Sequence, residues 1–158
     1  MNNSFTYKNV DLSVFFQFSW GNDILNANRM VFENPSGRRH TNMFSSYVNR
    51  WTEDNPNSDM PRSQAVGSQE YSSLYVEDGS FLRLKSLSLG YNFQPRILNQ
   101  LKVSSARVSF TAENLFTITS YSGNDPEVST RHSVLTPGFD WSPYPRSRSY
   151  SLSLNLTF

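Results

Sequence analysis

Apolar and polar residues alternate along four segments of the chain, near residues 9–20, 80–93, 103–120 and 146–158. Successive side chains of a β-strand point to opposite faces, so this alternation predicts strands that have one apolar and one polar face. The last segment shows the pattern most cleanly, because Ser, Asn or Thr stands between the apolar positions Tyr150, Leu152, Leu154, Leu156 and Phe158. The pattern therefore predicts an all-β fold of antiparallel strands.

In the first segment Phe15 is an exception to the alternation, and the pattern is interrupted in two further segments. In the second, Arg83 and Lys85 fall on the same parity as the apolar residues that follow them. Either the strand leaves its apolar surroundings there, or a β-bulge shifts the parity. In the third, the pattern slips at residues 114–116.

The lengths of the strands and of their connections favour a membrane barrel. The predicted strands run about 11 to 14 residues, whereas five or six residues are usual in globular proteins and about 9–11 span a bilayer. Residues 21–79 and 121–145 form long connections, and only residues 94–102 separate the second and third strands. Antiparallel strands would place both long loops at one end of the sheet and the short turn at the other, as in outer-membrane barrels.

Composition narrows the classes of protein that fit. The 158 residues carry 14 Lys+Arg and 13 Asp+Glu, a balance that gives no reason to expect nucleic acid as a partner. The chain has no cysteine, which excludes disulfides and thiolate metal sites. Its apolar runs are all too short for a transmembrane helix. Aromatic residues reach 15% although mean hydropathy is −0.54, as expected when lipid-facing and water-facing positions alternate.

Four motifs carry a resemblance to a known family. They are YVEDGSFLRLK at 75–85, AENLFT at 112–117, YSGNDPEV at 121–128 and LNLTF at 154–158. In this order they resemble the C-terminal end of SusC/RagA-type TonB-dependent outer-membrane transporters. The resemblance implies an antiparallel transmembrane β-barrel segment, about the last four strands of a 22-stranded barrel. Residues 21–79 and 121–145 would be extracellular loops and residues 94–102 a periplasmic turn. The plug and the signal peptide are expected to be absent from this chain.

The resemblance also implies a function and a set of partners. The intact protein would sit in the cell outer membrane and import oligosaccharides or peptides, with a SusD-like surface lipoprotein over its extracellular face and TonB acting through the plug. Outer-membrane lipid would contact the apolar face, and no cofactor is expected. The last strand resembles the signal that the barrel-assembly machinery recognises, through the apolar positions Tyr150, Leu152, Leu154, Leu156 and Phe158.

The loops offer few candidates for chemistry. His40 and His132 have no neighbours in the sequence that would make a catalytic or metal site, so we expect solvated histidines and no enzyme. Residues that could contact substrate or partner are Trp51, Tyr121, Asp125, Glu127 and Trp141. The aromatic ones could equally pack the loops together, and residues 125–127 are equally typical of a turn.

Two other architectures produce the same alternation. A soluble β-sandwich that binds glycan through loop aromatics would pack its apolar faces against each other. A small complete porin-like barrel would need about eight strands, and the pattern predicts only four. The long strands and unequal connections favour the segment of a large barrel.

Overall fold

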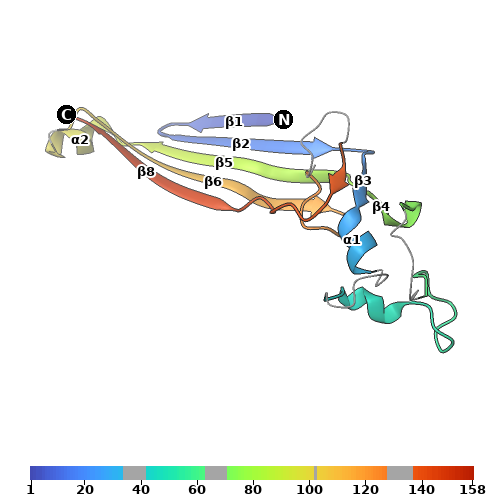
Figure 1. Ribbon diagram of the computed structural model, residues 1–158. Helices are drawn as coiled ribbons and strands as arrows, with labels where there is room; N and C mark the ends of the chain where they lie inside the picture. Colours follow the sequence, from blue (N-terminus) through green and yellow to red (C-terminus); the bar gives the residue numbers. More distant parts are fainter. Residues whose placement is uncertain (34–41, 63–70, 102, 128–136) are drawn as a thin grey trace. The chain divides into compact units, whose positions relative to one another are not determined.

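The computed structural model describes residues 1–33, 42–62, 71–101, 103–127 and 137–158 (Figure 1). The chain divides into two compact units. The strand unit comprises Met1–Trp20, Ser80–Thr119 and Arg146–Phe158, and the loop unit comprises Gly21–Gly79 and Ser120–Pro145. Within these described ranges, no helix is both long enough and apolar enough to cross a membrane.

The strand unit is an antiparallel sheet of five strands in the order β1-β2-β5-β6-β8 (Figure 1). The strands are β1 (Asn2–Tyr7), β2 (Val10–Ser19), β5 (Phe81–Asn92), β6 (Ser105–Thr119) and β8 (Ser149–Thr157). The prediction of a mainly β chain with antiparallel strands is confirmed. Among the described residues, β1 and β8 each have a neighbouring strand on one side only.

Strand β1 is not among the four strands that the alternation predicts. It forms a hairpin with β2 through Lys8, whose positive φ of 52° suits the tight turn, and Asn9. Asn3 pairs with Val14 and so takes an apolar-face position. The strand therefore offers only Phe5 and Tyr7 as apolar positions, too few for the alternation to stand out.

A β-bulge in β5 keeps the apolar residues of that strand on one face. Leu84 pairs with Phe16 and Leu87 with Val14, and the register shifts between these two pairs. Of the two alternatives that the parity of Arg83 and Lys85 left open, the bulge is confirmed. Asn114, where the alternation in β6 slips, has a positive φ of 53°.

The register places most apolar residues of the five strands on one face of the sheet, because cross-strand partners share a face. Phe15 and Phe81 are exceptions, since they pair with Ser86 and Ser19 on the opposite face. This apolar face includes several side chains that are largely exposed in the described chain, such as Phe18 at 66% and Leu152 at 76%. Its members are Phe5, Tyr7, Val10, Leu12, Val14, Phe16, Phe18, Leu82, Leu84, Leu87, Leu89, Tyr91, Ala106, Val108, Phe110, Ala112, Phe116, Ile118, Tyr150, Leu152, Leu154 and Leu156.

The opposite, polar face carries an ion pair that crosses the central strand. Asp11 on β2 pairs with Gly90 on β5, and Arg107 on β6 pairs with Asn92, two residues along β5 from Gly90. The Arg107 Nη1 and Nη2 atoms donate to the Asp11 Oδ1 and Oδ2 atoms at 2.7 and 2.8 Å, a bidentate geometry. A Cβ atom at Gly90 would overlap Arg107 Nη2 and lie 2.7 Å from Asp11 Oδ2. In this geometry the pair lies directly over the glycine, and a side chain there would force the guanidinium to shift.

The connections at the two ends of this sheet differ. One end carries the hairpin of β1 and β2 and the short helix α2 (Pro95–Leu101), which lies within the predicted turn at 94–102. Pro95 suits the first helical position, where its missing N–H costs nothing. At the other end Ser19, Phe81 and Thr119 lie in register, and the chain enters the loop unit after Trp20 and after Thr119.

The loop unit contains a small sheet and short helices. Its strands β3 (Asp23–Asn26), β4 (Val76–Asp78) and β7 (Phe139–Asp140) are ordered β4-β3-β7, with β3 antiparallel to β4 and parallel to β7. Helix α1 (Ala27–Phe32) follows β3. The unit also contains two 3₁₀ helices, η1 (Ser45–Asn49) and η2 (Ser73–Tyr75). A core forms where Ala27, Met30 and Tyr75 are buried with Leu25, Phe139 and Trp141 packed against them.

Replacement of Gly90 by Ala tests the importance of the bidentate pair. The new Cβ displaces the Arg107 guanidinium, so we expect a lower midpoint for heat unfolding of the protein in detergent. Asp11→Asn should lower the midpoint in the wild-type background and have little further effect beside Gly90→Ala, because both changes remove the same interaction.

Ser88→Ala is the matched control, since Ser88 lies two residues from Gly90 on β5 and its hydroxyl is 3.5 Å from that of Thr111. We expect it to leave the midpoint close to that of the wild type. Equal midpoints for wild type and Gly90→Ala would contradict the stabilising role of the pair.

Candidate functional site

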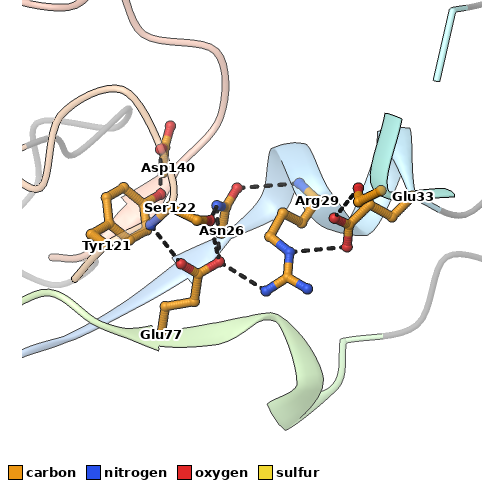
Figure 2. A network of polar contacts seen from close by, with 8 residues as sticks. Asn26, Arg29, Glu33, Glu77, Tyr121, Ser122 and Asp140 are labelled. Atoms are coloured by element: carbon orange, nitrogen blue, oxygen red, sulfur yellow. Dashed lines mark hydrogen bonds and ion pairs between the residues drawn. The ribbon is translucent and has the colours of Figure 1, made fainter. Parts of the chain in front are cut away.

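Asn26 joins three segments of the loop unit at the start of α1. Its Oδ1 atom accepts from the backbone N–H of Arg29 at 3.2 Å, the arrangement of a helix N-cap. Its Nδ2 atom donates to Glu77 Oε1 at 3.1 Å and to Ser122 Oγ at 3.2 Å (Figure 2). Only 2% of Asn26 is exposed, so its amide is committed to these contacts.

Glu77, on β4, accepts hydrogen bonds from several segments. Its Oε1 atom accepts from Arg29 Nη1 at 3.0 Å and from Ser122 Oγ at 2.8 Å, and its Oε2 atom accepts from the Ser122 backbone N–H at 2.9 Å. Burial alone would raise the pKa of this carboxyl. The hydrogen bonds from Ser122, Arg29 and Asn26 outweigh burial and hold the pKa of Glu77 below its usual value of 4.5.

Arg29 lies between two carboxylates. Its Nε atom donates to Glu33 Oε2 at 2.9 Å, one helical turn further along, and its Nη1 atom donates to Glu77 (Figure 2). Ser46 donates to the other oxygen of Glu33 at 2.7 Å. Burial lowers the pKa of Arg29, but the two carboxylates more than compensate and the pKa is raised overall. The arginine therefore remains a cation whose charge is balanced locally.

A second part of the network centres on Asp140. The buried Tyr121 donates its hydroxyl to Asp140 Oδ2, and Asn28 Nδ2 donates to Asp140 Oδ1 at 3.0 Å. Asn28 Oδ1 in turn accepts from the backbone and the side chain of Ser142 at 2.8 and 2.9 Å. Burial and the neighbouring Asp140 raise the pKa of Tyr121 well above its usual value, so the phenol remains a donor.

The loop residues proposed from the sequence occupy different surroundings. Tyr121 and Asp125 are buried, and Asp125 Oδ1 accepts from the Glu127 backbone N–H at 2.9 Å, as in an Asx turn. Trp141 packs against the core of the loop unit. Trp51 is half-buried and donates its backbone N–H to the Met60 carbonyl at 3.0 Å. His40 and His132 lie outside the described residues.

A cleft of about 750 Å³ opens beside this network, within the size range of ligand-binding pockets. Phe32 and Phe44 contribute two rings to its lining, with centroids 5.4 Å apart and planes at 44°. None of the five loop residues proposed from the sequence is part of the described lining. The lining consists of Asn26, Asn28, Arg29, Phe32, Glu33, Phe44, Ser45, Ser46, Ser122, Gly123, Asn124, Ser142 and Pro143.

No local sequence pattern predicts this cleft. Its lining comes from four short stretches, near residues 26–33, 44–46, 122–124 and 142–143, which only the folded chain brings together. Such Asn- and Ser-rich stretches occur along the whole chain, so composition could not have identified them. In the part of the chain that the structure describes, no group of three or more His, Cys, Asp or Glu residues is placed to hold a metal ion.

Comparison with curated proteins identifies relatives of the chain. No protein-family model matches it. TonB-dependent receptor P3 of Formosa agariphila is 39% identical over 162 residues, a match that covers 99% of this chain and 16% of the receptor. TonB-dependent receptor SusC of Bacteroides thetaiotaomicron is 33% identical over 158 residues, covering 96% of this chain and 14% of the receptor. The chain thus spans about one sixth of the length of these relatives.

Solved structures give the same result. The RagAB peptide transporter is 31% identical with a TM-score of 0.81, over 97% of this chain and 16% of that chain. The RagAB peptide importer in its closed-closed state has a TM-score of 0.80 over 99% of this chain and 17% of that chain. Together with the curated relatives, these matches confirm the resemblance that the four sequence motifs carry.

The lowered pKa of Glu77 predicts a pH dependence of the loop unit. Because the folded carboxyl has the lower pKa, its stabilisation is fully present above the unfolded value of 4.5 and is lost as pH falls through the folded pKa. We expect the protection of backbone amides in α1 and β4 against hydrogen exchange, corrected for intrinsic rates, to be constant from about pH 5 to pH 8 and to fall in more acidic solution.

Glu77→Gln should reduce this protection at neutral pH and flatten its decline in acid, because the ion pair with Arg29 is lost. Glu53→Gln, a change at an exposed carboxylate of the loop unit, is the control and should leave the profile unchanged. A Glu77→Gln profile identical to that of the wild type would show that Glu77 does not hold the loop unit together.

Proposed function

We propose that this chain, which belongs to the SusC/RagA family of TonB-dependent receptors, forms part of the wall of an outer-membrane β-barrel, at the C-terminal end of the receptor. The observation that carries the proposal is the apolar face that continues across five antiparallel strands. Strands β2, β5 and β6 have 10, 12 and 15 residues, enough to cross a bilayer, and β8 has 9.

The two faces of the sheet then meet two different surroundings. The apolar face contacts outer-membrane lipid, which accounts for exposed side chains such as Phe18 and Leu152. The polar face lines a water-filled lumen, where Ser, Thr and Asn side chains remain hydrated. The pair of Asp11 and Arg107 belongs on this side, because a charged pair facing hydrocarbon would lose its hydration.

The edges of the sheet support a larger barrel. Hydrocarbon offers no hydrogen bonds, so each backbone N–H or C=O left without a partner there costs several kcal/mol. Strands β1 and β8 stand at the edges of the described sheet. In the barrel these edges pair with further strands of the receptor, of which the chain spans about one sixth.

The proposed activity is nutrient import across the outer membrane, with an oligosaccharide or a peptide as substrate. Relatives named SusC and RagAB peptide transporter support this class of function. We assign residues 21–79 and 121–145 to the extracellular side, where a SusD-like lipoprotein would cover them. TonB would supply the energy for import through the plug. In β8 and at the chain end, the barrel-assembly machinery would recognise Tyr150, Leu152, Leu154, Leu156 and Phe158.

Arginine substitutions at two adjacent positions of β5 test the proposal. Each is made in the receptor expressed in its bacterial outer membrane. Leu89→Arg places a cation in lipid and should cost about 2–4 kcal/mol at the bilayer mid-plane. Ser88→Arg introduces the same residue on the polar face and should be tolerated. We expect only the Leu89 variant to lose the folded, heat-modifiable form in outer-membrane fractions.

Fractionation of the wild-type protein completes this test. Folded protein recovered from the aqueous fraction without detergent would contradict the proposal and favour a soluble β-sandwich that binds glycan. Equal losses for the Leu89 and Ser88 variants would also contradict it, because a barrel wall must distinguish its two faces.

A further inference from the structure

The cleft in the loop unit presents mainly uncharged hydrogen-bonding groups. Side-chain amides and hydroxyls both donate and accept hydrogen bonds, as the hydroxyl groups of a carbohydrate do. These groups come from both stretches of chain that form the loop unit. The lining takes them from Asn28, Asn124, Ser45, Ser122 and Ser142, whereas the amide of Asn26 is committed to the network.

The charges of the described lining cancel. Arg29 and Glu33 are its two charged residues, and they pair with each other at 2.9 Å. Arg29 also contacts Glu77 at 3.0 Å, so its positive charge is shared by two carboxylates. A ligand with carboxylate or sulfate groups would meet more negative than positive charge in this network, and an uncharged ligand would meet no such penalty.

Two aromatic rings border the same space. Phe44 is 43% exposed, and its ring centroid lies 5.4 Å from that of Phe32. A sugar ring has an apolar face of C–H groups that stacks on aromatic rings, and a rim of hydroxyls that needs hydrogen bonds. The lining offers both kinds of contact together.

An extended peptide fits the described lining less well. Peptides that bind as added strands need a free sheet edge for their backbone hydrogen bonds. The lining takes one residue from a strand, Asn26 of β3, and β3 already pairs with β4 on one side and β7 on the other. The charged termini of a short peptide would also have to compete with the existing pair of Arg29 and Glu33.

The network holds the lining in place before any ligand arrives. Asn26, Arg29, Glu33 and Ser122 are each fixed by hydrogen bonds or ion pairs to other residues of the loop unit (Figure 2). Binding to side chains that are already ordered loses less conformational entropy. The geometry thus favours a site that is formed in the free protein.

We propose that this cleft binds a short neutral oligosaccharide and discriminates against anionic ones. The inference rests on the proposed function, since it specifies the substrate class for a loop region exposed to extracellular nutrients. Phe32 and Phe44 stack against the apolar face of a sugar ring. The amides and hydroxyls of Asn124 and Ser142 meet its hydroxyl groups.

Binding to the full-length receptor in detergent tests this proposal. The probes are maltotetraose, mannotetraose and xylotetraose as neutral ligands, tetragalacturonate and a sulfated chondroitin tetrasaccharide as anionic ligands, and tetra-alanine as a peptide. We expect at least one neutral tetrasaccharide to bind and both anionic probes to bind more weakly than it. Binding by none of the neutral probes, or a preference for an anionic probe or for tetra-alanine, would overturn the proposal.

Variants locate the binding in the cleft. Phe44→Ala should weaken binding of the neutral probe about 3- to 10-fold, the usual size of a lost ring contact, and Phe44→Tyr should retain it. Val48→Ala, at a side chain of η1 that is 76% exposed and outside the described lining, is the control. Hydrogen exchange of α1 verifies that each variant is folded. Unchanged affinity in a folded Phe44→Ala protein would refute the assignment.

The outcome separates this inference from the barrel proposal. A protein that inserts into the outer membrane but binds no neutral probe would refute the cleft assignment alone. A protein that binds a neutral probe but is recovered folded from the aqueous fraction would refute the barrel proposal alone.

Discussion

Segregation of apolar and polar side chains to opposite faces of one antiparallel sheet underlies the rest of the structure. It requires the register to hold over five strands, because a shift of one residue would turn every side chain of a strand to the other face. The bulge at Lys85 corrects such a shift, since it returns Leu82 and Leu84 to the face of Leu87. Gly90 serves the other face by leaving room for Arg107 to reach Asp11.

The loop unit is held together by different interactions. Its apolar core around Ala27, Met30 and Tyr75 is small, and buried polar groups connect the surrounding segments. Glu77 ties β4 to α1 and to Ser122, and Asp140 ties β7 to Tyr121 and Asn28. Such a network stabilises a fold only when its members have partners. The same contacts order the lining of the cleft, so stability and the proposed binding depend on one set of side chains.

The sequence predicted the sheet better than the loop unit, for physical reasons. Alternation is a local signal, and strands such as β8, with a polar residue between each pair of leucines, carry it plainly. β1 lacks it because Asn3 takes an apolar-face position. The contacts of Glu77 with Arg29 and Ser122 link residues 48 and 45 positions apart, and no local pattern encodes such pairings. Tyr121 was proposed as a contact residue, and its burial against Asp140 becomes evident only in the folded chain.

The most direct test of the membrane-wall account is the accessibility of spin labels placed one at a time along β6 of the receptor in lipid bilayers. Labels at Val108 and Phe110 should collide readily with oxygen dissolved in lipid and poorly with a water-soluble nickel chelate. Labels at Ser109 and Thr111 should show the reverse, giving a period of two residues. Labels at Val108 and Phe110 shielded from both reagents would place the apolar face inside a protein core and contradict the account.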